Sequence, residues 1–397
     1  MKVEDRALCL VHLLKTCASY TEDGEFKKAG SRLECIATVA AADGDLMQRL
    51  ATYFLDGLSY RLVKNIHGVP EALSLLSIPF STLLQQYARK LFFEFCPFLK
   101  FSHMITNQAI VEAMGGDQVV HIIDLNACDA AQWICLLYGL KEKWQGIAVP
   151  YVKITGIHEN KGVLEQTGIQ LIQEAEKMGI PLNFYPIESQ LEKLCFENLP
   201  VKPGEPLAIS SVLQLHSLLA VDDQISPDSV LPPNPSQFDS PKMSWFLNNL
   251  WKLKPRLMVI TEQESDNNAP SLTERLDKTL NFYAALFDCL EANVPKERAI
   301  ERIMVERMLL GEEIKNIISC DGVDRKERHG KFYKTWHPWL ELAGFKRVPF
   351  HYERMLQITR PLQSYGRGYK LLADSNNQCL FTCWNDLPLY SISAWKF

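Results

Sequence analysis

The sequence lacks several features that mark special classes of protein. It has no charge-free apolar run long enough to span a bilayer, so we expect no membrane segment. Its eleven cysteines include no CxxC pair and no Cys/His run at zinc spacing, which favours a reduced compartment. The first residues, MKVEDRALCLVHLL, carry acids early and no small-residue cleavage site, which argues against a signal peptide. We therefore expect a soluble, intracellular protein.

An excess of one charge and the common catalytic motifs are also missing. The net charge is −5 over 397 residues, of which 47% are hydrophobic and 22% charged, an ordinary globular composition for one large or two moderate domains. A weakly negative net charge argues against a protein that binds nucleic acid over its whole surface, and leaves open a local basic patch. Without a GxSxG motif, a P-loop or a Cys–His pairing, hydrolase and phosphotransfer chemistry lack support.

The first 115 residues repeat apolar positions at helical spacing. Breaks at 21–24 and 43–45 separate the helices, and an Asp in the second break can cap the helix that follows. Pro97 splits two further helices between residues 81 and 114. A heptad-like seam is formed by Phe26, Ala29, Leu33, Ile36 and Ala40. We predict an N-terminal α-helical cap subdomain over residues 1–115.

From Val119 onward, short apolar runs alternate with helical segments. Nearly continuous apolar runs are typical of parallel strands covered on both faces; they are VVHIIDL, YVKITGI, LNFYPI, LAISSV and LMVITEQE. These β–α units predict an α/β core over 116–397 with a doubly wound, Rossmann-like, mostly parallel sheet. Two apolar runs around Asp374–Asn377 predict a C-terminal antiparallel hairpin, an ending that resembles small-molecule methyltransferases. Residues 221–242, rich in Pro, Ser and Asp, predict a mobile surface loop.

The turn after the first strand tests whether such a core could bind a methyl-donor cofactor. S-adenosylmethionine at this edge requires a glycine-rich turn, and the residues after Asp124, LNACDAA, contain no glycine. Glu159, after the second strand, is the one acidic candidate for holding ribose hydroxyls. With Ser210 and Glu262 these residues form at most a vestigial pocket, so we expect no cofactor and no catalysis. Asp124 is better explained as a helix cap or loop tie than as a ligand contact.

Other polar residues also have a structural interpretation beside a functional one. His121, inside an apolar strand, is expected to be a hydrogen-bonded core residue, because no second metal ligand lies at useful spacing. Glu262 and Glu264 could do acid–base work, but a structural or solvated role is favoured. Basic residues at 298–307 and 325–331 alternate with glutamates, which is typical of a salt-bridged, solvated helix surface. Direct, sequence-specific DNA binding is therefore disfavoured.

An LxxLL pattern near the start points to partner binding. Leu10, Leu13 and Leu14 fit the pattern of helices that lay apolar anchors in a partner's groove. The same pattern arises in any buried amphipathic helix, so both explanations stay open. Leu33 and Ile36 of the seam join these leucines as candidates for partner contact.

Four groups of residues, in order over nearly the whole chain, resemble the VHIID, second leucine-rich, PFYRE and SAW regions of the plant GRAS-domain family. The residues that carry this resemblance are Val120, His121, Ile122, Ile123, Asp124, Gln132, Trp133, Leu215, His216, Phe282, Tyr283, Arg325, Arg328, His329, Trp384, Ser393, Ala394 and Trp395. GEEIKNIISC and YAALFDCLE are most similar to the scarecrow-like branch linked to gibberellin and DELLA signalling, which some mycorrhiza-related members also resemble. The resemblance implies a single GRAS domain over 1–397.

The resemblance also implies a function. It indicates a transcriptional regulator or coregulator of the nucleus, and also the cytoplasm, that works through protein–protein contacts and without a cofactor or metal. The implied partners are DNA-bound zinc-finger proteins of the indeterminate-domain class, DELLA and other GRAS proteins, with a homo- or heterodimer possible and DNA contact indirect. One alternative is a small-molecule-binding or S-adenosylmethionine-dependent protein; a second is a direct DNA-binding transcription factor. Trp384 and Trp395 are expected to anchor the core of the last strands.

Overall fold

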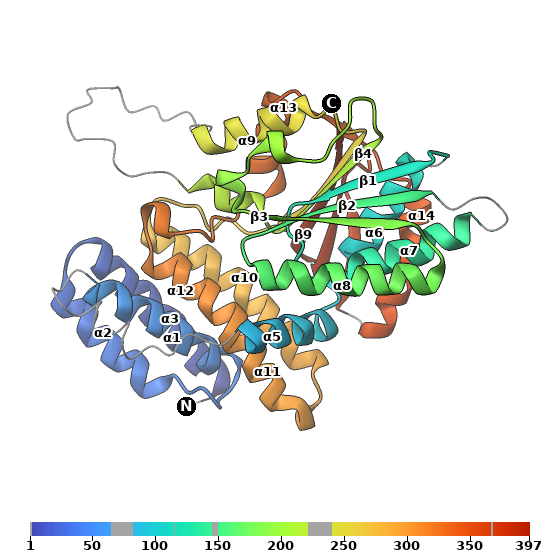
Figure 1. Cartoon of the computed structure of the whole chain (residues 1–397). Coiled ribbons are helices and arrows are strands. Elements are labelled where there is room, and N and C mark those ends of the chain that lie inside the picture. The colour runs from blue at the N-terminus through green and yellow to red at the C-terminus, as the bar shows by residue number, and fades with distance from the viewer. Residues whose placement is uncertain (1, 65–81, 115, 145–149, 221–239, 367) are drawn as a thin grey trace, which may run out of the picture. The chain divides into compact units, whose positions relative to one another are not determined.

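The computed structural model describes residues 2–64, 82–114, 116–144, 150–220, 240–366 and 368–397 (Figure 1). These residues form two compact units. The helical unit takes in the described residues of Met1–Pro97, Ala220–Ser229 and Ser265–Gly330. The sheet unit takes in those of Phe98–Leu219, Val230–Glu264 and Lys331–Phe397.

This division differs from the expected one at residue 115. Helix α6 (Phe98–Ala113) packs on α7 (Ala131–Lys143) in the sheet unit, although it lies within the predicted cap. Conversely, the segment Ser265–Gly330 belongs to the helical unit, where its helices α10 (Leu272–Asn293) and α12 (Gly311–Ser319) pack on the N-terminal helices. The apolar stripes of those N-terminal helices are thus buried by a segment more than 200 residues away in sequence.

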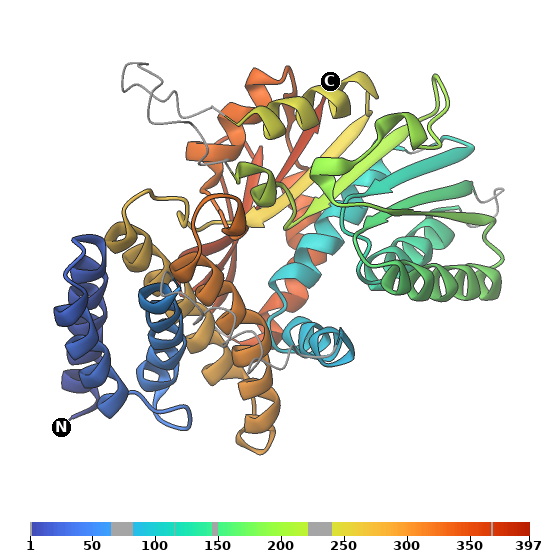
Figure 2. The same cartoon turned by 60° about the vertical axis from the view of Figure 1, so that its left-hand side comes forward.

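The helical unit is built from amphipathic helices that pack side by side (Figure 2). The two predicted breaks are confirmed: the chain turns at Gly24 with φ +74, and Asp45 caps the third helix by accepting a hydrogen bond from the Gln48 backbone N–H. This third helix, α3 (Leu46–Val63), approaches α12 closely, because a Cβ on Gly57 would lie only 3.1 Å from Ile318. The other helices are α1 (Val3–Glu22), α2 (Phe26–Val39), α5 (Thr82–Phe95) and α11 (Ala299–Val305).

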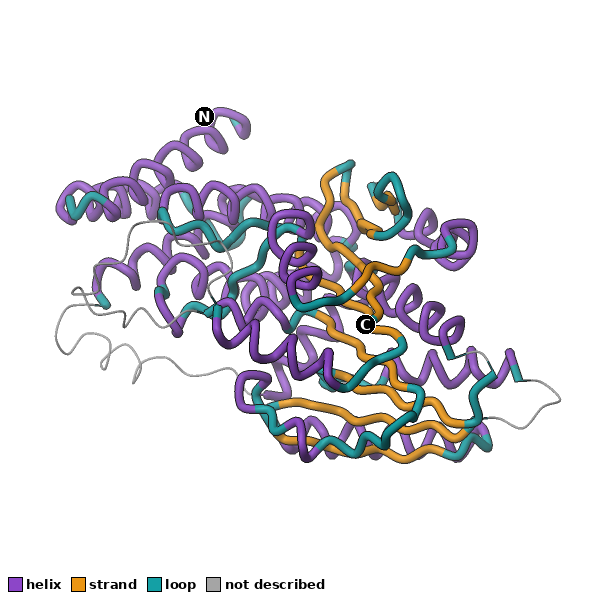
Figure 3. Tube along the Cα trace, turned by 90° about the horizontal axis from the view of Figure 1, so that it is seen from above, coloured by secondary structure: helices purple, strands orange, loops and turns teal. Residues whose placement is uncertain are grey.

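The sheet unit contains a nine-stranded sheet that confirms the predicted topology. Its strands run in the order β3-β2-β1-β4-β5-β9-β8-β7, with β6 paired to β9. Strands β1 to β5 pair with one another in parallel. Strands β6 to β9 pair antiparallel, and β7 and β8 form the predicted hairpin. Figure 3 shows the strands twisting from one edge of the sheet to the other. The strands are β1 (Val119–Asp124), β2 (Tyr151–His158), β3 (Leu182–Glu188), β4 (Leu207–Val212), β5 (Leu257–Gln263), β6 (Lys346–Val348), β7 (Tyr369–Ala373), β8 (Cys379–Trp384) and β9 (Leu387–Lys396).

Helices cover both faces of this sheet, as the nearly continuous apolar strands require (Figure 1). One face carries α6, α7, α8 (Lys161–Met178) and α14 (Tyr352–Thr359), around a core that includes Trp133. The other face carries α9 (Pro241–Lys252), α13 (His337–Leu342) and the 3-10 turn η3 (Leu215–Leu219), around a core that includes Phe246 and Trp395. None of the helices in the described ranges is long and apolar enough to cross a membrane.

The predicted loop over 221–242 is only partly tested. Residues 221–239 lie outside the described residues. The last three positions are not loop but the start of α9, where Ser240 is the N-cap and accepts a hydrogen bond from the Met243 backbone N–H. Proline at the first helical position explains this helix start, because its missing N–H has no intrahelical partner to lose.

Candidate functional site

The carboxylate of Asp124 ties down the loop that follows β1. This buried side chain accepts hydrogen bonds from the Asn126 backbone N–H at 2.9 Å and from the Trp133 indole Nε1 at 2.7 Å. Trp133 lies in the first turn of α7, so one strand-end carboxylate fixes both the loop and the helix after it. Burial raises the pKa of Asp124 to about 6, although both hydrogen bonds favour the charged form. These hydrogen bonds agree with the interpretation that Asp124 holds the loop after β1 in place.

The backbone of the same loop is bonded to neighbouring strands. The Leu125 N–H donates to the Ser210 carbonyl at 2.9 Å, and the Ala127 N–H donates to the Ile157 carbonyl at 3.0 Å. The loop therefore lies across the ends of β1, β2 and β4, with the side chains of Leu125 and Ala127 buried. A cofactor at this edge would need the backbone to approach it closely with free N–H donors. Here side chains fill the turn, and the backbone N–H groups of residues 125–128 already donate hydrogen bonds.

The structure places Glu159 and Ser210 in different surroundings. Glu159 is exposed after β2 and accepts a hydrogen bond from the Gln190 side chain at 3.1 Å. Ser210 sits opposite Asp124 in the β1–β4 register and is fully buried. Among the described residues, neither the Ser210 hydroxyl nor that of Thr261 on β5 has a hydrogen-bond partner. Both side chains are fully buried in the sheet.

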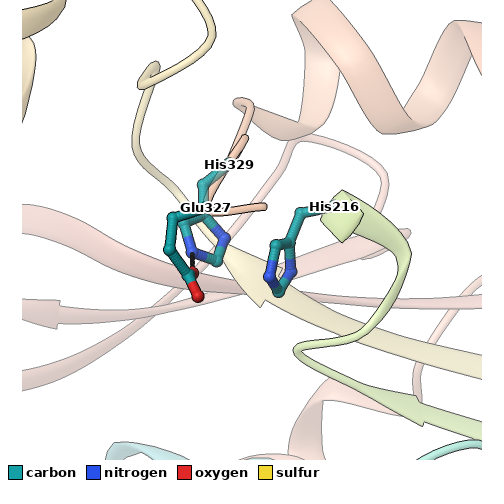
Figure 4. Close-up of side chains that lie close together, drawn as sticks. All are labelled: His216, Glu327 and His329. Atoms are coloured by element: carbon teal, nitrogen blue, oxygen red, sulfur yellow. Dashed lines mark hydrogen bonds and ion pairs between the residues drawn. The ribbon is translucent and has the colours of Figure 1, made fainter. Parts of the chain in front are cut away.

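Glu262 holds the start of the second leucine-rich region. Its buried carboxylate accepts from the backbone N–H groups of Gln214 at 3.1 Å and Leu215 at 2.8 Å. The second carboxylate oxygen lies 3.2 Å from Nδ1 of His216, which Figure 4 labels. A carboxylate that accepts the first N–H groups of a helical turn stabilises that turn. These contacts give Glu262 a structural role, which is the role favoured from the sequence.

His121 lies in a buried polar network at the other end of the strands. Its Nε2 lies 3.0 Å from the Thr155 hydroxyl, and its Nδ1 lies 3.2 Å from the Glu205 carboxylate. Lys153 pairs with the same carboxylate at 2.8 Å. Burial, reinforced by the Lys153 charge, lowers the pKa of His121 to about 4, so the imidazole is neutral at physiological pH. The geometry agrees with a hydrogen-bonded core histidine.

The segment with Arg325, Arg328 and His329 corrects an interpretation made from the charge pattern. All three side chains are buried, and residues 325–331 form no helix in the described chain. The arginines point toward the loop that contains Asn268, to whose side-chain oxygen both donate. His329 Nε2 lies 2.8 Å from the Glu327 carboxylate (Figure 4). The solvated helix surface predicted here was therefore wrong.

The N-terminal candidates for partner contact are also mostly buried. Leu10, Leu13, Leu14 and Ile36 lie inside the helical unit, and Leu33 is half-buried. A partner could reach the LxxLL leucines only after α1 separated from the helices around it. The LxxLL pattern is therefore that of a buried amphipathic helix. Phe26, by contrast, does not continue the buried seam, because its side chain is mostly exposed.

The remaining motif residues lie in the core or at its edge. Trp384 and Trp395 are buried, in agreement with their expected role as core anchors, and the Trp395 indole donates to the Ser393 hydroxyl at 2.9 Å. Phe282 and Tyr283 are buried on α10. The Gln132 carbonyl accepts from the Asn107 side chain at 2.8 Å. The Asn107–Gln132 contact joins α6 to α7, and the other residues are buried in the core, so all of them have a structural role.

One exposed apolar surface was missed from the sequence. Trp245 and Trp251 of α9 are 45% and 38% exposed, and Leu342 at the end of α13 is 70% exposed. The end of α9 lies against the turn after α13, because a Cβ built on Gly344 would lie 3.1 Å from the Trp251 indole Nε1, whereas the Trp245 ring packs edge-on against Phe196 with their centroids 5.5 Å apart. We call Trp245, Trp251 and Leu342 the α9/α13 surface. A helical wheel of α9 could have shown it, since both tryptophans fall off the face formed by Met243, Phe246, Leu247 and Leu250.

Comparisons with known proteins converge on one family. The family model described as GRAS domain family matches residues 10–396. The chain is 46% identical to GRAS family protein TF80 of Medicago truncatula, over 96% of this chain and 93% of that protein. It is 43% identical to Scarecrow-like protein 3 of Arabidopsis thaliana, over 100% and 90%, and 31% identical to DELLA protein RGL1 of the same plant, over 99% and 71%. The crystal structure of SCL7 in Oryza sativa is similar with a TM-score of 0.79 and 25% identity, covering 98% of this chain and 99% of that one.

Proposed function

The chain belongs to the GRAS domain family of plant transcriptional regulators, and on this premise we propose that it is a transcriptional coregulator in gibberellin-linked growth or development. It acts in the nucleus, and also in the cytoplasm, through contacts with other proteins. Its partners are DNA-bound zinc-finger proteins of the indeterminate-domain class, DELLA proteins and other GRAS proteins, so its contact with DNA is indirect. The similarity to scarecrow-like and DELLA relatives over nearly the whole chain supports this proposal.

The α9/α13 surface is the observation that carries the proposal. Tryptophan is enriched among residues that dominate binding energy, because it buries a large apolar area with few rotatable bonds. Two partly exposed tryptophans lie on one helix, and the turn after the exposed Leu342 lies beside Trp251, so a partner has exposed apolar side chains to cover. The surrounding positions on α9 include Asn248 and Lys252, which are exposed and polar and could form the rim.

An enzymatic role is not part of the proposal. The loop after β1 has no glycine, and its buried carboxylate and the backbone N–H groups of residues 125–128 are hydrogen-bonded within the sheet unit. A further relative, 30% identical over 96% of this chain, is named Scarecrow-like transcription factor PAT1 of Arabidopsis thaliana. The function therefore depends on the surface of the protein rather than on chemistry at the edge of the sheet.

Replacing both exposed tryptophans is expected to weaken partner binding. Trp245→Ala/Trp251→Ala should raise the Kd for an indeterminate-domain zinc-finger protein or a DELLA protein by about tenfold or more, since each truncation removes a large apolar contact. The measurement is a pull-down with purified partners, followed by titration of those that bind. Tyr138→Ala is the matched control, because Tyr138 is an exposed aromatic residue on α7 of the same unit. Wild-type affinity in the double variant, or no binding of any of these partners to the wild type, would refute the proposal.

Two alternatives make different predictions. A small-molecule binder would use the unpartnered hydroxyls of Ser210 and Thr261, and would give saturable heats with S-adenosylmethionine. A direct DNA-binding factor would shift promoter fragments without a partner, and its affinity would fall steeply with salt because of counterion release.

A further inference from the structure

Three buried arginines of the helical unit share the same acceptors. Arg275 is 2% exposed, and Arg325 and Arg328 are each 5% exposed. Arg275 and Arg325 both donate to the carbonyl of Ala269, at 3.3 and 3.5 Å. Arg325 and Arg328 both donate to the side-chain oxygen of Asn268, at 3.3 and 3.2 Å. Because neighbouring guanidinium groups share acceptors, their positive charges lie close together. We call these three residues the arginine cluster.

Little negative charge compensates Arg275 and Arg325. In the described part of the chain, the ion pair of Arg275 is with Asp321, at 3.4 Å, and Arg325 has none. The Asp321 carboxylate also pairs with Arg61 at 2.9 Å and with Lys64 at 2.8 Å, so three cations share it. A buried charge without a counter-charge is strongly unfavourable.

Two arginine N–H donors without a hydrogen-bond partner also indicate that the site lacks acceptors. Nε of Arg275 and Nε of Arg325 are buried and have no hydrogen-bond partner among the described residues. Burial, followed by the nearby charge of Arg61, lowers the pKa of Arg275 to about 10. Arg275 and Arg325 thus have more donors and positive charge than the described residues around them have acceptors and negative charge. An anion with several oxygen atoms would supply both.

We propose that the arginine cluster binds a small oxyanion and that its ligand is a phosphate group. Guanidinium groups recognise phosphate oxygens with paired, charge-assisted hydrogen bonds. The arginines are too deeply buried for the backbone of a nucleic-acid duplex to reach, whereas a small anion could enter beside Asp321, whose side chain is 44% exposed. The phosphate could be free inorganic phosphate or the phosphate group of a small metabolite. This site consists of residues of the helical unit, whereas the α9/α13 surface belongs to the sheet unit, and the inference does not depend on the proposed regulatory partners.

Titration of the whole chain tests the proposal. Inorganic phosphate and glycerol 3-phosphate are added at matched ionic strength, with chloride as the reference, and binding is followed by calorimetry and by the melting temperature. We expect saturable binding and a higher melting temperature with at least one phosphate compound. A preference for inorganic phosphate would identify the free ion as the source, and a preference for the organic compound would identify a phosphorylated metabolite.

Three variants make the test specific. Arg325→Gln should weaken phosphate binding by about tenfold, because it removes a charged donor pair. Asp321→Asn should strengthen binding by about threefold or more, because the carboxylate that competes for the same cations is neutralised. Arg298→Gln is the control, since Arg298 pairs with Glu94 and Glu301 of the same unit and should leave affinity unchanged. If Arg325→Gln does not fold, Asp321→Asn decides the question. Absence of saturable binding in both wild type and Asp321→Asn, or equal affinity in all folded variants, would overturn the proposal.

Discussion

Deletion of Ser393–Phe397 is expected to abolish cooperative folding of the sheet unit. The deleted residues complete β9, which lies between β5 and β8 and also pairs with β6. Without them, β6 loses every partner of its ladder, and β5 loses its pairing with Ser393, Ala394 and Trp395. Loss of the fully buried Trp395 alone should cost about 3–5 kcal/mol. The whole deletion should therefore remove most of the stability of an ordinary domain, about 5–15 kcal/mol.

Thermal unfolding followed by circular dichroism measures this effect. Deletion of Phe397 alone is the matched control, because this exposed residue lies beyond the end of β9. The control should melt like the wild type, whereas the longer deletion should lose the cooperative transition of the sheet unit. An unchanged melting transition in the longer deletion would mean that the SAW region is a contact surface and not part of the core.

Loss of Glu306 is expected to destabilise the helical unit by about 3–5 kcal/mol, because it leaves Arg49 with a buried charge that is only partly paired. The two side chains are almost fully buried, and the Arg49 guanidinium donates to the Glu306 carboxylate at 3.1 and 3.2 Å. Arg49 keeps a second partner in Glu291, whose carboxylate is half-exposed. Glu306→Leu should therefore lower the midpoint of urea unfolding strongly.

Two further variants separate charge from packing. The double variant Arg49→Met/Glu306→Leu should regain much of the lost stability, because replacing both partners removes the uncompensated charge. Lys15→Gln removes the exposed ion pair with Asp277 and should change stability by less than about 1 kcal/mol. The explanation fails if Glu306→Leu unfolds at the wild-type urea concentration, or if the double variant is no more stable than Glu306→Leu.

Several motif residues that identify the family serve the fold. Asp124 and Trp133 join β1 to α7, and His121 lies in a buried polar network. Glu262 holds the turn that begins at Leu215. Since these polar groups are bonded within the sheet unit, they explain the architecture and not the choice of partner. The surfaces that remain for recognition are those formed by exposed side chains.

Local patterns were sufficient to predict much of the architecture. Apolar runs such as Leu207–Val212 are typical of strands covered on both faces, and the structure confirms this strand. The turn at Asp374–Asn377 and the cap at Asp45 depend on residues close in sequence, and both were predicted. The alternation of strands and helices along the chain predicted the parallel sheet. Two consecutive apolar runs with a turn between them predicted the C-terminal hairpin.

Long-range packing decided what local patterns could not. Arg325 and Arg328 alternate with acidic residues, as on a solvated helix. In the structure they are buried and donate hydrogen bonds to Ala269 and Asn268, more than 50 residues earlier in the chain. Leu10 and Leu14 have the same spacing in a buried helix as in a docking motif, and only the packing of α1 on α2, α3 and α10 distinguishes the two. The division into units depends in the same way on where α10 and α12 pack.

Calorimetric titration with S-adenosylmethionine and its demethylated product is the most direct test of the central claim, that the protein works through its surface and not through a cofactor. The wild type, shown to be folded by its melting transition in the same buffer, should give only heats of dilution, because the turn after Asp124 is filled by side chains and by hydrogen bonds within the sheet unit. Saturable binding of either compound with a Kd of about 1 μM or lower, near −8 kcal/mol, would contradict the account.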